Sequence, residues 1–151
     1  MNQLLTEVSD NEIAEEYVAR FQRTVGERLQ KSITVANHLR AILSAYAKDV
    51  EHFVCIFLDS QLRIITTEVV AHGTIASSAV YPREIIKLVF QHEAAHVILG
   101  HNHPSGETIP SSSDRALTKK LVVALASLDI SVFDHVIIGE GFYSFSDEGL
   151  L

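Results

Sequence analysis

The 151-residue chain has one cysteine and no tryptophan. A single cysteine, Cys55, excludes an internal disulfide and every cysteine-rich structural zinc site, and it fits a reducing cytoplasm. Cys55 lies in the apolar run HFVCIFLD, where we expect a buried and unreactive thiol. No stretch approaches the roughly 18 apolar residues that a membrane span needs, and the polar start MNQLLTEVSDNEIAEE is unlike a secretory signal. We therefore expect a cytoplasmic protein that makes no membrane contact.

Positive charge is also scarce in this chain. Its 12 Lys and Arg residues stand against 19 Asp and Glu residues, which gives a net charge of -7. This balance argues against a broad positive surface for nucleic acid, although it leaves room for a local basic groove. The hydrophobic fraction of 47% and the lack of low-complexity tracts predict one folded domain with a substantial core.

Hydrophobic spacing predicts two helices before the first strand. Residues 10–31 form an amphipathic pattern that Asp10 or Asn11 could cap, and residues 34–49 form a second pattern with Thr34 as the N-cap. The following run 52–59 is short, continuous and rich in β-formers, as in a strand that is covered on both faces.

The remaining elements alternate between strands and helices. A turn at 59–61 and a strand at 62–73 complete a predicted hairpin. Further on, we predict a helix over 82–95 with Pro82 at its start, a strand over 97–103 and a loop over 104–114. A long helix over 114–129, capped by Ser111 or a neighbour, and two strands over 130–139 and 142–145 complete the chain. This order predicts an α/β fold with a central sheet flanked by helices.

Two different zinc patterns lie within the stretch HEAAHVILGHNHPSG. The first, His92-Glu93-x-x-His96, is typical of helical metalloproteases, in which both histidines bind zinc and the glutamate is the general base. It requires a helix that continues through His96, yet Val-Ile-Leu follows, which favours a strand. The extended form of the pattern also needs Gly and His where Leu99 and Asn102 stand. The alternative is that these side chains make hydrogen bonds and packing contacts at a helix end.

The second pattern pairs His101 with His103 at the end of a strand, where residues two apart point to one face. Asp114 follows eleven residues after His103, in the first turn of the next helix. Two imidazoles and a carboxylate would leave a fourth tetrahedral position open for water. The alternatives are that the histidines are polar surface residues and that Ser111-x-x-Asp114 is a capping box. A cap and a ligand role are compatible, because a carboxylate at a helix N-terminus stays ionised.

The spacing His101-x-His103-Pro104, then Ser111 and Asp114, resembles the JAMM motif of the MPN-plus metalloproteases. With YPREI at 81–85, HNHPSG at 101–106, PSSSD at 110–114 and DHVIIG at 134–139, the chain is similar to the RadC family in its short form. The resemblance covers about 32–151 and implies a JAB/MPN-like domain with a central mixed β-sheet, preceded by an N-terminal helical extension at 1–31. RadC proteins usually carry an N-terminal helix-hairpin-helix domain, which about 31 residues do not provide, and this weakens an inference about DNA. The family commonly has asparagine at position 93.

The resemblance implies a zinc-dependent hydrolase that binds one zinc ion, with a water, through His101, His103 and Asp114. Glu68 would be the general acid/base, and Ser111 would hydrogen-bond the developing oxyanion. By strand alternation Glu68 shares a face with apolar residues, an unusual place for a carboxylate without a partner; a glutamate at the sheet edge is the alternative. His135 matches a family position and is expected to be structural or to support a ligand.

Relatives with this motif cleave peptide or isopeptide bonds, so a protein or peptide is the expected substrate. Two other functions remain open at this stage. One is a metal-dependent enzyme that acts on nucleic acid, as the family's DNA-repair label suggests, and the other is a non-catalytic MPN-type scaffold that binds partners. The scaffold is less favoured because such modules typically lack motif residues that this chain retains. A deaminase-like zinc site is excluded, since it needs a P-C-x-x-C pair.

Overall fold

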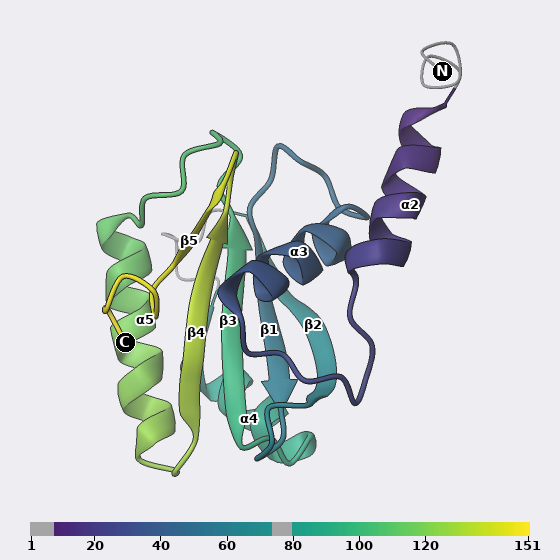
Figure 1. The fold of residues 1–151 in the computed structure, drawn as a ribbon. Helices are drawn as coiled ribbons and strands as arrows, with labels where there is room; N and C mark the ends of the chain where they lie inside the picture. Colours follow the sequence, from purple (N-terminus) through teal and green to yellow (C-terminus); the bar gives the residue numbers. More distant parts are fainter. Residues whose placement is uncertain (1–7, 74–79) are drawn as a thin grey trace.

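A computed structural model describes residues 8–73 and 80–151 of the chain (Figure 1). The predicted order of helices and strands is confirmed. The elements are α2 (Asp10–Phe21), α3 (Ser32–Leu43), β1 (His52–Leu58), β2 (Ile64–His72), α4 (Pro82–Gln91), β3 (His96–Asn102), α5 (Ser112–Ala126), β4 (Ser131–Ile138) and β5 (Phe142–Ser144). The first seven residues of the predicted extension 1–31, and Thr74 in the stretch that follows Glu68, lie outside the described residues.

The five strands form one mixed sheet in the order β2-β1-β3-β4-β5, which confirms the predicted α/β class. β1 pairs antiparallel with β2 and with β3, and β4 pairs antiparallel with β5. β3 and β4 are parallel, and α5 connects them. The carboxyl ends of two parallel strands are where open α/β sheets commonly bind ligands. His101 lies near this end of β3, and His103 directly follows the strand.

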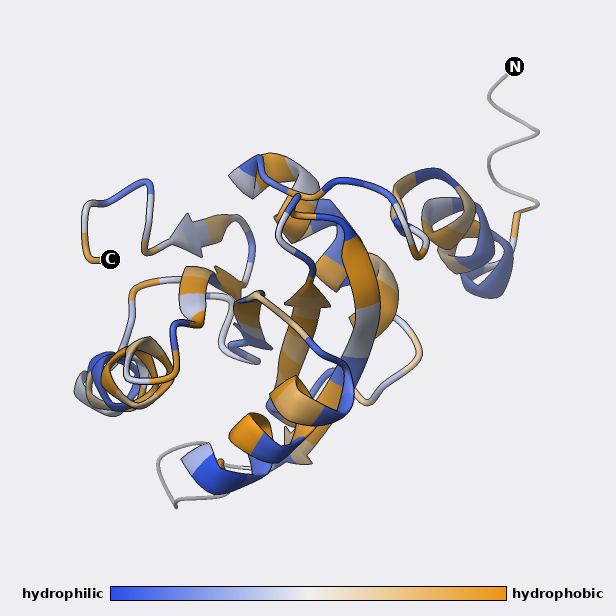
Figure 2. Ribbon diagram, turned by 90° about the horizontal axis from the view of Figure 1, so that it is seen from below, coloured by the Kyte–Doolittle hydropathy of each residue, from blue (hydrophilic) through white to orange (hydrophobic). Residues whose placement is uncertain are grey.

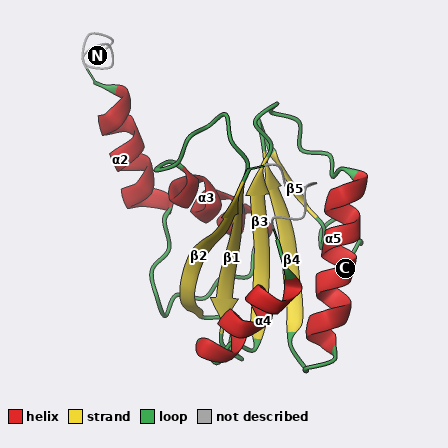
Figure 3. Ribbon diagram, turned by 180° about the vertical axis from the view of Figure 1, so that it is seen from behind, coloured by secondary structure: helices red, strands yellow, loops and turns green. Residues whose placement is uncertain are grey.

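Helices cover both faces of the sheet. α3 lies across one face, and α4 and α5 lie on the other, as the opposite views show (Figures 1 and 3). All seven residues of β1 are buried, and the side chains of 53–58 alternate between two core clusters, one on each face of the sheet. Cys55 is fully buried as predicted, and this burial, with the nearby Glu68 carboxylate, raises the pKa of its thiol far above the usual value. Figure 2 shows the hydrophobic residues concentrated in the central strands and in the helix sides that face them.

The predicted helix over 10–31 is too long, because α2 ends at Phe21. Beyond it, Gly26 has a φ of 89°, and the chain continues as an extended segment bonded to the edge of β2. Leu29 donates its backbone N–H to the Leu62 carbonyl at 2.8 Å and is fully buried. The edge strand therefore gains backbone partners that helical periodicity could not predict.

The predicted helix caps are confirmed in part. Ser9, rather than Asp10 or Asn11, is the N-cap of α2, and it forms a capping box with Glu12. α3 begins at Ser32 and not after Thr34, and its N-cap residue makes no side-chain hydrogen bond. The Ser111 cap of α5 is confirmed. None of the helices within the described residues is long and apolar enough to cross a membrane.

Candidate metal centre

The HEAAH stretch is a helix terminator and not a helical metal site. α4 ends at Gln91, and Glu93 has a left-handed φ of 52°. Ala94 donates its N–H to the Val89 carbonyl at 3.0 Å, and Glu93 donates to Phe90 at 3.2 Å. These two bonds are those of a Schellman motif, which closes a helix and favours glycine or asparagine at the left-handed position. Glu93 therefore occupies a position whose backbone conformation suits glycine or asparagine better than glutamate.

The two histidines of this stretch have separate environments. His92 caps α4, its Nε2 lies 3.3 Å from Glu68 Oε1, and its ring packs on Phe57 at 5.2 Å between centroids. His96 is the first residue of β3, and its Nδ1 lies 2.5 Å from Ser131 Oγ. The interpretation of HEAAH as a zinc motif is therefore wrong, because the helix that it requires ends before His96.

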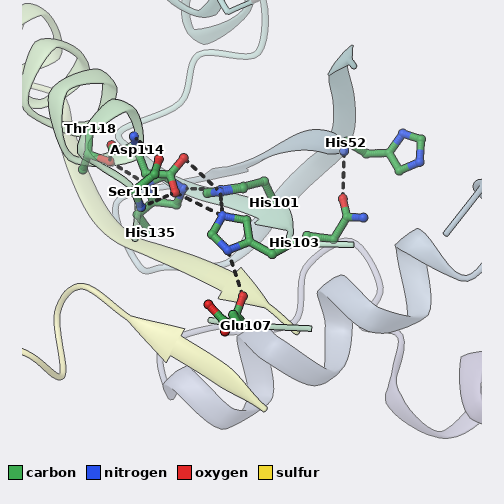
Figure 4. Close-up of polar contacts among 9 residues, drawn as sticks. His52, His101, His103, Glu107, Ser111, Asp114, Thr118 and His135 are labelled. Carbon is green, nitrogen blue, oxygen red and sulfur yellow. Dashed lines mark hydrogen bonds and ion pairs between the residues drawn. The ribbon is translucent and has the colours of Figure 1, made fainter. Parts of the chain in front are cut away.

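The second pattern brings three side chains together. His101 is near the end of β3, His103 follows the strand, and Asp114 is in the first turn of α5 (Figure 4). His101 Nε2 lies 3.0 Å from His103 Nε2 and 3.2 Å from Asp114 Oδ1, and His103 Nε2 lies 3.1 Å from Asp114 Oδ2. Within the described part of the chain, these three form the one group whose geometry could hold a metal ion.

The dimensions of this group fit a tetrahedral metal site. For metal–ligand bonds of about 2.0–2.1 Å, tetrahedral geometry places neighbouring ligand atoms roughly 3.3 Å apart. The two imidazole nitrogens lie 3.0 Å apart, and each lies 3.1–3.2 Å from one of the two Asp114 carboxylate oxygens, so the separations are close to this value. A neutral imidazole has one bare nitrogen, and His103 Nδ1 faces the Glu107 carbonyl oxygen at 2.8 Å, which can only accept. Neutral His103 therefore directs the lone pair of its Nε2 at the other two side chains.

Asp114 combines the cap and the cluster in one carboxylate. Its Oδ2 accepts the Ser111 N–H at 2.8 Å, and its own N–H donates to Ser111 Oγ at 3.0 Å, so the predicted capping box is present. Burial raises the pKa of Asp114, but the hydrogen bond and charge of His101 and the bonds from Ser111 outweigh this effect. The net result is a pKa well below the usual range. The carboxylate is therefore ionised at neutral pH, as a metal ligand must be.

Behind His101 lies a buried chain of polar contacts. His101 Nδ1 lies 2.8 Å from His135 Nε2, and His135 Nδ1 lies 2.6 Å from Thr118 Oγ1. The Thr118 hydroxyl donates to the Asp114 backbone carbonyl at 2.7 Å, one helical turn back. Burial, and then the neighbouring His101, keep the pKa of His135 far below its usual value. His135 was predicted from the sequence to be structural or to support a ligand, but Thr118 was not predicted to take part. Its position four residues after Asp114, on the same side of the helix, could have indicated the contact.

The turn between β4 and β5 anchors the loop that carries His103. His103 donates its N–H to the Ile138 carbonyl at 2.8 Å, and Glu140 donates its N–H to the Gly106 carbonyl at 2.8 Å. These bonds join HNHPSG to the last residue of DHVII and to the turn after it, so two segments far apart in sequence hold each other in place.

Glu68 lies on the same sheet face as His101 but on β2, with β1 between the two strands. It pairs with Cys55 across the sheet, and its carboxylate contacts His92. It is not part of the group whose ligand atoms lie within 4.8 Å of one another. Glu68 therefore has a partner on this face of the sheet, namely His92. The role of Glu68 as general acid/base stays a prediction, as does that of Ser111.

A groove of about 800 Å³ borders the cluster at His103. It lies between α2, the C-terminal end of α3, the loop after β3 and the turn after β4. Apolar and charged side chains both line it, among them Ile13, Tyr17, Arg40, Lys48 and Glu140. Of the three clustered side chains, His103 is the one that lines this groove.

Comparison with known proteins agrees with this geometry. A model of the RadC-like JAB domain matches residues 29–150. The chain belongs to the RadC family. The family is associated with a metal-dependent hydrolase fold, and the His101, His103 and Asp114 cluster could bind the metal ion. The predicted domain boundary at residue 32 stays a prediction.

Relatives in several bacteria are described as UPF0758 proteins. One from Thioalkalivibrio sulfidiphilus is 42% identical over 134 residues, which cover 86% of this chain and 60% of the relative. One from Thiobacillus denitrificans is 46% identical over 127 residues, covering 83% and 56%. One from Vibrio atlanticus is 43% identical over 133 residues, covering 85% and 59%. The chain thus spans less than two thirds of the length of these relatives.

Proposed function

We propose that this RadC-family chain is a zinc-dependent hydrolase that cleaves a peptide or isopeptide bond. The observation that carries the proposal is the convergence of three side chains. His101 Nε2 and His103 Nε2 lie 3.0 Å apart, and they lie 3.2 Å from Asp114 Oδ1 and 3.1 Å from Asp114 Oδ2, respectively. Two imidazoles and one carboxylate suit zinc, and three protein ligands are typical of a catalytic rather than a structural site. When bound, zinc would make hydroxide available at neutral pH by lowering the pKa of a coordinated water toward about 7.

In this proposal, Glu68 accepts the proton of the attacking water and delivers it to the leaving group. A hydrogen bond from His92 would support the position of this carboxylate on β2. Ser111 would stabilise the developing oxyanion. Its exposed side chain supports this role, since Oγ accepts from Asp114 N–H and its hydroxyl hydrogen remains available to a substrate.

The groove beside His103 supports a peptide as the substrate. Its volume of about 800 Å³ is within the range of clefts that bind ligands. Its lining mixes apolar side chains with both signs of charge, which suits a peptide better than a uniformly negative backbone. The net charge of -7 also disfavours nucleic acid.

The test compares Glu68→Gln with the wild type and with Glu93→Gln, the matched change in the HEAAH stretch. Glu68→Gln should bind one zinc per chain and lose hydrolysis of a fluorogenic peptide library by roughly 10²- to 10⁴-fold, the usual contribution of a general base. Glu93→Gln should retain both properties. Normal hydrolysis by Glu68→Gln would refute the assigned mechanism. Cleavage of DNA in place of peptides, with steep salt dependence, would favour the nucleic-acid alternative.

A further inference from the structure

The polar chain behind His101 has a defined proton order. A threonine hydroxyl has one hydrogen, and that of Thr118 is donated to the Asp114 carbonyl at 2.7 Å. Such bonding to the carbonyl four residues back is common for threonine in helices. Thr118 Oγ1 must then accept from His135, whose Nδ1 lies at 2.6 Å. Because neutral His135 has one ring hydrogen, its Nε2 is left as an acceptor.

His135 connects this proton order to the metal cluster through His101. His101 Nδ1 lies 2.8 Å from His135 Nε2, which accepts, so Nδ1 carries a hydrogen and Nε2 is the ring nitrogen that can bind a metal. That Nε2 faces Asp114 Oδ1 at 3.2 Å. The four contacts therefore form a closed ring. It runs from the Asp114 backbone carbonyl through Thr118, His135 and His101 to the Asp114 carboxylate. All four members are buried, with exposed fractions of 3%, 2%, 0% and 0% for Asp114, Thr118, His135 and His101.

We propose that Thr118 and His135 are positioning residues that fix His101 as the Nδ1–H tautomer, and so present its Nε2 lone pair to the metal. This inference rests on the proposed zinc site and deepens it, because it names residues that bind no metal yet determine its affinity. The ring also couples two ligands, since the helical turn that holds Asp114 also holds the hydroxyl that orients His101.

The opposite proton order shows what the hydroxyl prevents. If Thr118 gave its hydrogen to His135, then His135 Nε2–H would donate to His101 Nδ1. The hydrogen of His101 would then be on Nε2 and would point at Asp114, where it would compete with a metal ion. Because the ring is buried, an N–H left unpaired within it would have no water as a partner. All the hydrogens of the ring must therefore follow one order or the other.

The experiment replaces Thr118 by valine, which has nearly the same shape but cannot accept the His135 Nδ1–H. In metal-free wild type, ¹⁵N NMR of the histidine rings should show a hydrogen on His101 Nδ1. In Thr118→Val it should show Nε2–H, and zinc affinity measured against a chromophoric chelator should fall about 10- to 100-fold, as is usual when a partner of a ligand is lost. Thr118→Ser restores the hydroxyl and should return both readouts to the wild-type result.

Thr67→Val is the matched control, because the Thr67 hydroxyl contacts another buried histidine, His38, at 2.9 Å and is remote in the fold from the cluster. It should change neither the His101 tautomer nor zinc affinity. A wild-type His101 in the Nε2–H form would overturn the inference even if Thr118→Val failed to fold. Wild-type zinc affinity in a folded Thr118→Val would also overturn it. Failure of the wild type to bind zinc would instead refute the proposed function, since the tautomer is measured without metal.

Discussion

The backbone carbonyl of Gly106 fills the space that a β-carbon on Gly139 would occupy. Gly106 follows the histidine pair in HNHPSG, and Gly139 ends DHVIIG. The N–H of Glu140 donates to that same carbonyl at 2.8 Å, so the loop cannot move away without losing a hydrogen bond. The absence of a side chain at position 139 is therefore a condition for the position of His103.

Gly139→Ala should displace the loop. We expect a loss of roughly 1–3 kcal/mol in the free energy of unfolding, as for other overpacked sites, together with weaker zinc binding. Urea unfolding and chelator competition measure the two effects. Gly141→Ala is the matched control, since a β-carbon there meets nothing within 4 Å, and it should change neither quantity. Equal behaviour of the two variants would contradict this view of the loop.

Glu93 has a left-handed φ of 52°, a conformation that is costly for most residues with a β-carbon. Glu93→Asn should therefore stabilise the fold by about 0.5–1 kcal/mol, because asparagine tolerates this position at a helix end. Glu93→Val should be destabilising, since a β-branched side chain is especially disfavoured there. Thermal unfolding of both variants measures the difference. Neither should change zinc stoichiometry, and loss of zinc from Glu93→Asn would revive the HEAAH interpretation.

His38 links α3 to two other segments as a buried, neutral imidazole. Its Nδ1 accepts the Arg23 N–H at 2.9 Å, and its Nε2 lies 2.9 Å from Thr67 Oγ1. Burial, aided by the positive charge of Arg23, lowers the pKa of His38 from 6.5 to about 4, against a smaller opposing effect of Glu27. Between these two pH values the unfolded chain binds a proton that the folded chain does not.

The stability from His38 is therefore complete above pH 6.5 and is lost as the pH falls toward 4. One group with this shift accounts for roughly 3 kcal/mol over that range. Urea unfolding of wild type and His38→Gln, both with chelator present so that their metal content is equal, isolates the effect. The dependence on pH should be shallower in His38→Gln by about this amount. Parallel curves for the two proteins would show that His38 does not titrate as described.

Local patterns in the sequence predicted much of the fold and of the cluster. The burial of β1 followed from its continuous apolar run, because a strand covered on both faces needs apolar residues at every position. The i, i+2 spacing of His101 and His103 and the capping box at Asp114 are also local features, and both are present.

Features that depend on tertiary pairing could not be predicted in this way. The contact between His92 and Glu68 joins a helix end to an edge strand, and that between Thr118 and His135 joins α5 to β4. Seventeen residues separate the second pair, and no periodicity connects them. The end of α2 was missed for a similar reason, since the chain after Phe21 bonds to β2 rather than continuing its helix.

The central claim is that zinc binds at His101, His103 and Asp114 and not at HEAAH. The most direct test is the zinc content of wild type, His103→Ala and His92→Ala, each purified without chelators or a histidine tag and then supplied with zinc. We expect about one zinc per chain in wild type and His92→Ala, and none in His103→Ala. Loss of zinc from His92→Ala alone, or no zinc in the wild type, would contradict this claim.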